Sequence, residues 1–254
     1  MTSLTLTPLK GLPEIRQGDD LAVLLTEALV RQGMMASRGD VLVLCQKVVS
    51  KCEGRCFSLD RIEPSDRAMS VAALCQKEPS LVELVLREST EIIRCVPGVL
   101  VVRHRLGFVV ANAGVDQSNV LDGDHHALLL PENPNASAAR IREALRRRTN
   151  VDVPVLINDS FGRAWREGVV GTCIGSSGFR ALADRRGLRD RHGRALKSTQ
   201  VAGADELSAA ASFVMGQGNE GVPAIWVRGV KPDWFSDDVS ATELLRPAQR
   251  DLFL

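Results

Sequence analysis

Two polar segments of the chain place carboxylates where proteins often bind a metal ion. In one segment an apolar run leads into Asn112-Ala-Gly-Val-Asp-Gln-Ser-Asn119, and in the other Pro154-Val-Leu-Ile leads into Asn158, Asp159 and Ser160. Carboxylate, amide and hydroxyl oxygens suit a hard cation such as Mg²⁺ or Mn²⁺, whose remaining positions are filled by water and substrate phosphates. The pair Asp116 and Asp159 therefore predicts a metal site, although the first segment alone is more typical of a polar turn.

Other segments, either basic or rich in glycine, could bind the phosphates of a substrate that coordinates such a metal. Arg163 and Arg166 can make forked hydrogen bonds to phosphate or carboxylate oxygens, and surface ion pairing is the alternative. Lys47 and Lys51 are further candidates, although lysines in such positions are usually just solvated. Met215-Gly-Gln-Gly-Asn-Glu-Gly221 could cup phosphate oxygens with its backbone N–H groups. It lacks the Gly-Lys-Ser/Thr ending of a Walker A loop, so a helix end followed by a turn is the alternative.

Composition excludes several classes of protein. The net charge is +1, aromatic residues make up 4% of the 254 residues and tyrosine is absent, which argues against a nucleic-acid partner. No secretion signal or membrane-length apolar run is visible, so we expect a cytoplasmic protein with reduced cysteines. Cys52 and Cys56 raise the question of zinc, but no second Cys or His pair stands at a suitable spacing.

Apolar patterning predicts helices and strands in alternation. Helices are expected from Asp19 or Asp20 onward, from Pro64, from Pro79, and over 135–148 and 205–215. Strands are expected at residues 41–45, 99–102, 108–111, 127–130, 154–157, 169–174 and 223–227, with a polar loop at 112–126. Their irregular spacing favours a mixed α+β fold of one domain, 1–254, or of two interleaved subdomains.

Seven segments, in order along nearly the whole chain, resemble the coenzyme F420-0:γ-glutamyl ligase family. They are residues 11–15, 39–55, 112–120, 128–134, 158–171, 204–206 and 215–223. The ending LLRPAQRDLFL resembles the close of the ligase domain in the fused two-domain form, whose nitroreductase-like second domain is not expected here.

The resemblance implies a GTP-dependent ligase. Such an enzyme adds L-glutamate to the lactyl carboxylate of coenzyme F420-0, then adds further glutamates by γ-linkage, and releases GDP and phosphate through an acyl phosphate. An intertwined homodimer, one or two Mg²⁺ or Mn²⁺ ions and stimulation by K⁺ are also implied. The partners expected are therefore GTP, L-glutamate, coenzyme F420-0 and a second copy of the chain, without nucleic acid or membrane.

The resemblance also assigns roles to individual positions. Asp116 and Asp159 match first-metal aspartates, Ser160 and Gln217 match second-metal positions, and Asn119 matches a nucleotide contact. The remaining nucleotide-binding positions are Leu12, Pro13, Glu14, Ile15, Gln46, Lys47, Lys51, Met215, Gly216, Gly218, Asn219, Glu220, Gly221 and Val222.

Three positions depart from the family pattern. Gln217 replaces a glutamate, Ser160 replaces a threonine, and Lys47 replaces a small hydroxylated residue. Serine keeps the hydroxyl oxygen, whereas glutamine removes a negative charge and should weaken the second metal site. Two other functions stay open at this point: a ligase that acts on a different acid, and a non-catalytic module that binds a nucleotide or a deazaflavin.

Overall fold

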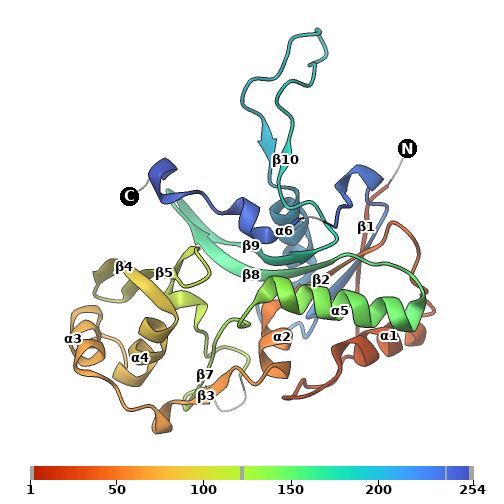
Figure 1. The fold of residues 1–254 in the computed structure, drawn as a ribbon. Helices are drawn as coiled ribbons and strands as arrows, with labels where there is room; N and C mark the ends of the chain where they lie inside the picture. Colours follow the sequence, from red (N-terminus) through yellow and green to blue (C-terminus); the bar gives the residue numbers. More distant parts are fainter. Residues whose placement is uncertain (1–2, 121–122, 238, 252–254) are drawn as a thin grey trace.

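A five-stranded mixed sheet forms the centre of the molecule (Figure 1). The structure is a computed structural model that describes residues 3–120, 123–237 and 239–251. Across the sheet the strands are β1 (Thr5–Pro8), β12 (Ala224–Arg228), β2 (Val41–Cys45), β8 (Val155–Arg163) and β9 (Arg166–Ser177). The pair β2 and β8 is parallel, and every other neighbouring pair in this sheet is antiparallel.

Alternating side chains of the central strands enter two different cores. Leu42 and Leu44 of β2 pack in the core beneath helices α1 (Leu21–Arg31) and α5 (Pro134–Thr149). Val41 and Val43 face the opposite side, where helix α6 (Gly203–Met215) covers the sheet. Because both faces are covered, β2 is a continuous apolar run, as expected for a strand buried on both sides.

Polar side chains fix the ends of the two helices on the first face. The carboxylate of Asp20 accepts hydrogen bonds from the N–H groups of Ala22 and Val23 and so begins α1. Asn133 caps α5 in the same way, with Pro134 in the first turn. At Gly171 of β9 a β-carbon would lie 2.5 Å from Ser212 of α6, so glycine permits this close approach.

The buried carboxylate of Asp40 joins the start of β2 to the end of β12. It is 1% exposed and accepts a hydrogen bond of 2.8 Å from the indole N–H of Trp226. The Arg228 guanidinium donates to both of its oxygens, at 2.8 and 2.7 Å, and the Ser37 N–H donates at 2.9 Å. A charge this deep is tolerated only when it is paired and hydrogen-bonded in this manner.

Residues 56–129, which lie in the sequence between α2 (Gln46–Cys52) and α5, form a separate lobe with a second hydrophobic core. In Figure 1 this lobe lies to the lower left of the central sheet, with α3 and α4 at its outer side. Its elements are β3 (Cys56–Ser58), α3 (Asp66–Cys75), α4 (Pro79–Arg87), β4 (Ser89–Val96), β5 (Val99–His104), β6 (Val109–Ala111) and β7 (His126–Leu128). Strands β4, β5 and β6 form an antiparallel sheet, and β3 pairs with β7.

A long arm projects away from the sheet beside α6 (Figure 1). Its base is the short pair β10 (Ala183–Asp184) and β11 (Gln200–Val201). The arm is otherwise irregular, and the last part of the chain contains 3₁₀ turns at Pro232–Trp234, Ala241–Leu244 and Ala248–Arg250. The lobe has two further 3₁₀ turns, at Leu59–Arg61 and Asn112–Gly114. Among the described residues, no helix is both long and apolar enough to cross a membrane.

The structure confirms the mixed α+β fold and most of the expected elements. The helix after Asp20, the helix over 135–148 and the strand pair at 99–102 and 108–111 are all present. The expected end of a strand at Asn158 was wrong, because β8 continues through Asp159 to Arg163 after a register shift at Ile157 and Asn158. The polar loop expected at 112–126 includes residues 121 and 122, which lie outside the described residues.

Glu88 is the charged group at which the lobe meets the segment that leads into α5. Its buried carboxylate lies 2.8 Å from the Arg55 guanidinium, 3.0 Å from that of Arg105 and 3.4 Å from Nε2 of His104. Arg105 and Arg55 also donate to the carbonyl oxygens of Glu132 and Leu130, respectively. Burial opposes ionisation, but hydrogen bonds from His104 and Arg55 and the charge of Arg105 hold the pKa of Glu88 at about 2.

We expect Glu88→Gln to destabilise the protein in a pH-dependent way. Because the folded pKa lies below the ordinary value of 4.5, the contribution of Glu88 is complete above pH 4.5 and declines as the pH falls towards 2. Urea unfolding at pH 7 should show a loss on the order of 3 kcal/mol, since two arginines lose a buried partner. The difference from wild type should narrow at pH 3.5.

Glu91→Gln provides the matched control. Glu91 pairs with Arg103 at 3.1 Å, but its side chain is 58% exposed. Its loss should change the free energy of unfolding by less than about 1 kcal/mol. Equal effects of the two substitutions, or a Glu88→Gln effect that does not change with pH, would contradict the importance given to this cluster.

Candidate active site

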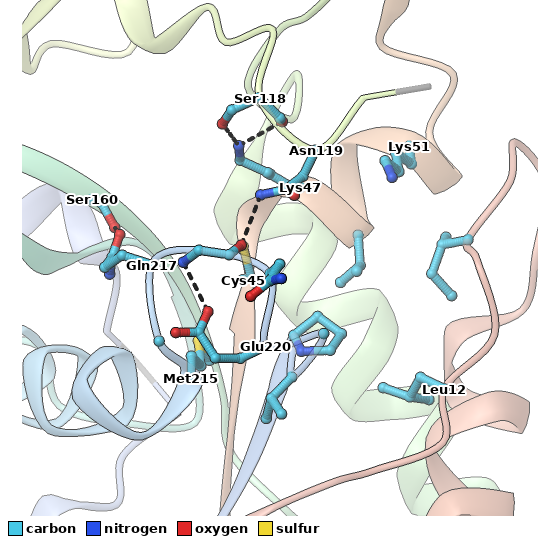
Figure 2. A pocket seen from close by; sticks show the side chains of 18 of the residues that line it. Leu12, Cys45, Lys47, Lys51, Ser118, Asn119, Ser160, Met215, Gln217 and Glu220 are labelled. Atoms are coloured by element: carbon cyan, nitrogen blue, oxygen red, sulfur yellow. Dashed lines mark hydrogen bonds between the residues drawn. The ribbon is translucent and has the colours of Figure 1, made fainter. Parts of the chain in front are cut away.

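A cavity of about 640 Å³ opens where five segments that are distant in sequence meet. They are the loop of residues 12–15, helix α2, the loop of residues 116–120, the middle of β8, and the chain from the end of α6 to β12. Figure 2 shows Ser160 and Gln217 on one side of this cavity and Lys51 and Leu12 on the other, with Lys47 between them. The volume lies in the range usual for cavities that bind small molecules.

The parallel pair β2 and β8 brings two of these segments together. Cys45 at the end of β2 lies opposite Asn158 of β8. The chain after Cys45 turns into α2, which carries Lys47, while β8 continues into Asp159. Both strands therefore deliver polar side chains at the same edge of the sheet, where ligands of open α/β sheets usually bind.

The 56–129 lobe delivers Asp116. Its backbone pairs with that of Leu128 through hydrogen bonds of 3.0 and 2.8 Å, and the neighbouring Val115 is buried in the lobe core. Three successive residues before it, 112–114, have φ values of 50°, 53° and 68°, of which only the last belongs to a glycine. Such left-handed conformations are unfavourable for other residues and are often found at functional sites.

The carboxylate of Asp116 is paired with Lys47. The Lys47 ammonium lies 2.6 Å from Oδ2 of Asp116, and it also donates to the hydroxyl and carbonyl oxygens of Ser118 at 2.6 and 2.8 Å. The Ser118 N–H donates to Oδ1 of Asp116 at 2.7 Å. Burial favours the neutral acid, but the hydrogen bonds from Lys47 and Ser118 keep the pKa of Asp116 below its ordinary value. Asp116 is therefore ionised at neutral pH.

Asp159 has the opposite electrostatic environment. Burial raises the pKa of its carboxyl to about 6, and the negative charge of Asp116 raises it further. The hydrogen bond from the Ser160 N–H and the positive charge of Lys47 lower this pKa, but by less. Among the residues described, no Lys or Arg lies within ion-pair distance of Asp159. A second negative charge beside Asp116 is unfavourable unless a cation compensates for it.

The donor set fits a hard divalent cation. Asp116 and Asp159 supply carboxylate oxygens, and the Ser160 hydroxyl and the Gln217 amide supply neutral oxygens nearby. No cluster of three or more His, Cys, Asp or Glu side chains occurs in the described parts of the chain, so water and substrate oxygens would complete the coordination. A cation at this place would favour the ionised form of Asp159, whose pKa burial raises.

Gln217 is held in place as a neutral group. Its Oε1 accepts a hydrogen bond of 2.9 Å from the Ser160 hydroxyl, and its Nε2 donates to the Ser212 hydroxyl at 2.7 Å. The amide thus connects β8 to helix α6. The arrangement offers one neutral oxygen at the predicted second metal position and no negative charge there.

The loop of residues 215–222 closes the cavity from the side of α6. The Gly218 N–H donates to the Glu220 carboxylate at 2.8 Å, and the Gly218 carbonyl accepts from the Asn119 amide at 3.3 Å. The Glu220 carboxylate therefore accepts a hydrogen bond from an N–H group of the predicted phosphate loop. On the opposite wall Lys51 pairs with Glu14 at 2.5 Å. The 215–222 loop on one side of the cavity and helix α2 on the other thus carry groups suited to an anionic ligand.

Most of the predicted site residues line this one cavity, but Arg163, Arg166 and Gln46 do not. Arg163 and Arg166 lie at the far end of the β8–β9 hairpin, where Arg163 donates to the carbonyl of Glu167 at 3.2 Å. They do not form a phosphate clamp in this structure because β8 continues instead of turning at Asn158. Gln46 is fully buried and its Oε1 accepts from the Ser50 hydroxyl at 2.8 Å, so its side chain does not reach the cavity.

The cavity also contains residues that sequence reasoning did not select. Ser118 and Asn158 belong to the same two polar segments as Asp116 and Asp159, so their position in the sequence could have identified them. Ser212 lies on α6 and carried no signal. The other residues in this group are Cys45, Val48, Val120 and Pro223. Burial raises the pKa of the Cys45 thiol to about 11, which argues against a nucleophilic role for it.

The cysteines considered as a zinc pair lie apart from this cavity. The Cys52 thiol donates to the carbonyl of Asp19 at 2.6 Å, while Cys56 is exposed on β3. All six cysteines are free thiols.

Comparison with known proteins places the chain among ligases. The model of the family described as F420-0:γ-glutamyl ligase matches residues 11–229. A coenzyme F420:L-glutamate ligase of Methanothermobacter thermautotrophicus is 45% identical over 250 residues, covering 98% of both chains. Its namesake from Methanopyrus kandleri is 45% identical over 255 residues, covering 100% of this chain and 98% of the relative. That of Archaeoglobus fulgidus is 40% identical over 245 residues, covering 96% of this chain and 94% of the relative. The chain therefore belongs to the F420-0:γ-glutamyl ligase family.

Proposed function

We propose that the protein is a GTP-dependent ligase that adds L-glutamate to the lactyl carboxylate of coenzyme F420-0 and then extends the product by γ-linkage. The observation that supports this most directly is the single cavity that unites Asp116 and Asp159 with three of the segments expected to bind nucleotide. The relatives named coenzyme F420:L-glutamate ligase match the chain over nearly its full length. The reaction class and the site geometry therefore point in the same direction.

Amide formation from a free carboxylate needs an activated acyl group. In the proposed first step, a carboxylate oxygen of F420-0 attacks the γ-phosphorus of GTP, the bond to the β-phosphate oxygen breaks, and GDP leaves. In the second step, the glutamate amine attacks the acyl phosphate, loses a proton, and expels inorganic phosphate. Because both nucleophiles belong to substrates, the protein contributes position and fixed charge, and no nucleophilic side chain is required.

The described residues divide these tasks between the walls of the cavity. Asp116 and Asp159 would hold a Mg²⁺ or Mn²⁺ ion, which supplies positive charge to the phosphate oxygens as the phosphoryl group moves. The 215–222 loop presents backbone N–H groups, and Lys47 and Lys51 present ammonium groups. Ser160 and Gln217 would offer a weaker second position for a cation, and we place any monovalent K⁺ ion among such neutral oxygens.

The assay that tests this function supplies purified protein with F420-0, GTP, glutamate and Mg²⁺. Mass spectrometry should detect the addition of one or more glutamyl units with matching release of GDP. Asp116→Asn should lower turnover by at least about 100-fold, because the metal loses a charged ligand while an amide of the same shape preserves the fold. Asp60→Asn makes the same chemical change at an exposed carboxylate of the lobe that does not line the cavity, and provides the control.

Other results would redirect the proposal. Release of GDP with a different carboxylic acid, but not with F420-0, would assign the chemistry to another acceptor. Tight binding of nucleotide or deazaflavin without GDP release would assign a non-catalytic binding role. Near wild-type ligation by Asp116→Asn would remove Asp116 from the reaction.

We further propose that two copies form a homodimer through α6 and the β8–β9 hairpin. Phe213 on α6 is 91% exposed, and Trp165 and Val169 on the hairpin are 87% and 55% exposed. Strand β9 is also the edge strand of the central sheet, and exposed edges invite pairing with another chain. The arm of residues 185–199 extends beyond this side without a core of its own (Figure 1).

Light scattering on the eluted protein should give the mass of a dimer. Phe213→Asp should shift this mass towards that of a monomer and leave the far-UV circular dichroism unchanged, because the side chain makes little contact within its own chain. Leu74→Asp, a substitution of an exposed leucine on α3, should leave the dimer intact. A wild-type monomer at micromolar concentration would contradict the proposal.

A further inference from the structure

We infer that Lys47 acts as a resident cation of Asp116: it competes with the divalent metal in the nucleotide-free protein and moves to the nucleotide phosphates when metal and nucleotide bind. This inference rests on the proposed function, because it concerns the metal and nucleotide of that reaction. It assigns to Lys47 the role of coupling the two ligands.

The coordination of the Lys47 ammonium resembles that of a bound cation. Its three neighbours are all oxygen atoms: Oδ2 of Asp116 at 2.6 Å, and the hydroxyl and carbonyl oxygens of Ser118 at 2.6 and 2.8 Å. An ammonium group has three N–H donors, so its hydrogen-bonding capacity is filled by these contacts. Carboxylate, hydroxyl and carbonyl oxygens are also the ligands that Mg²⁺ and Mn²⁺ prefer.

The pair leaves Asp116 little capacity for a metal. Oδ2 holds Lys47, while Oδ1 accepts the Ser118 N–H at 2.7 Å. The Lys47 and Asp116 side chains are 18% and 39% exposed, so water screens their attraction less than it does for most surface pairs. Oδ2 also accepts the Ser118 hydroxyl at 3.0 Å, so a metal that binds through Oδ2 must displace the ammonium group, and this displacement lowers the apparent affinity for the metal.

A second acceptor for Lys47 lies within the same cavity. The ammonium points toward Ser118 (Figure 2), and the 215–222 loop, where we place the phosphates of the nucleotide, lines the same cavity. Lysine is a compact charge on a flexible stem and can exchange a carboxylate for a phosphate by rotating its side chain. The nucleotide would then draw Lys47 away from Asp116 and strengthen metal binding, and by linkage the metal would strengthen nucleotide binding by the same factor.

Helix α2 offers a matched control for this lysine. Lys51 stands one turn after Lys47 and also lines the cavity, but its partner is Glu14, which lies beside it at 2.5 Å and is not a predicted metal ligand. Lys47→Met and Lys51→Met remove the same charge and keep similar stems. Only the first of these substitutions frees Asp116.

The test measures Mn²⁺ binding to the nucleotide-free protein from the spin-resonance signal of free Mn²⁺. Lys47→Met should bind Mn²⁺ about tenfold more tightly than wild type, and Lys51→Met should stay within about threefold of wild type. Adding Asp116→Asn to Lys47→Met should abolish the gain. With Mg²⁺ present, a fluorescent non-hydrolysable GTP analogue should bind Lys47→Met about tenfold more weakly than wild type.

Each other outcome overturns the inference. Unchanged or weaker Mn²⁺ binding by Lys47→Met would show that Lys47 does not compete for Asp116. Equal gains in the two lysine variants would show a general effect of charge. If Asp116→Asn alone abolishes Mn²⁺ binding while Lys47→Met has no effect, the proposed metal site stands and only the role of Lys47 fails. Ligation measured by mass spectrometry judges the proposed function separately.

Discussion

The parallel pairing of β2 with β8 determines where the chemistry of this protein can take place. Parallel strands end at the same edge of a sheet, so the segment that follows Cys45 and the segment around Asn158 must meet. One of them continues as helix α2, with Lys47 in its first turn, and the other continues as strand through Asp159. Helices on both faces of the sheet fix this pairing, because a shift of one residue would exchange the side chains that enter the two cores.

The charged side chains that lie at that edge of the sheet determine the electrostatics of the cavity. Asp116 arrives from the lobe already paired with a lysine, whereas Asp159 is buried beside a like charge and has a raised pKa. The two aspartates therefore differ in their electrostatic surroundings: Asp116 already has a cationic partner, and Asp159 has none among the described residues. The phosphate loop shows a similar internal pairing. The Gly218 N–H, a donor suited to a phosphate oxygen, donates instead to the carboxylate of Glu220. In this structure groups of the protein itself pair with Asp116 and with the Gly218 N–H, whereas Asp159 has no cationic partner among the described residues.

Much of the fold could be predicted from sequence because periodicity and capping act locally. The apolar run at 41–45, the helix start at Asp19 or Asp20 and the amphipathic pattern over 135–148 all correspond to elements that the structure contains. The polar run after Ile157 was taken as the end of a strand, since the register shift and the pairing with β9 that carry the strand onward depend on residues distant in sequence. Helix α2 was not predicted either, because no side chain caps its start. Strand β4 was missed although Pro97 and Gly98 mark the turn that ends it.

The candidate site divides in the same manner. Asp116 and Asp159 could be selected because polar residues follow apolar runs, and the 215–222 loop because its glycines follow an expected helix. The resemblance added Leu12 to Ile15 on a far part of the chain. Gln46 and Lys47 are neighbours in sequence, yet one is buried and the other lines the cavity, which is the consequence of a helix beginning directly after Cys45. Ser212 enters the site only because Gly171 lets α6 approach the sheet closely, and no local pattern announces such a contact.

The delivery of Asp116 by a lobe with its own core makes the site a shared property of two cooperative units. A molecule whose lobe has opened has lost a predicted metal ligand, even while the central sheet remains folded. Any ligand that contacts both units binds only the closed form, so it must slow amide hydrogen exchange throughout residues 56–129, far beyond the atoms that it touches. On the proposed function, the boundary between the lobe and the sheet would govern how long a nucleotide is retained, and substitutions around Glu88 would change the occupancy of a cavity that they do not line.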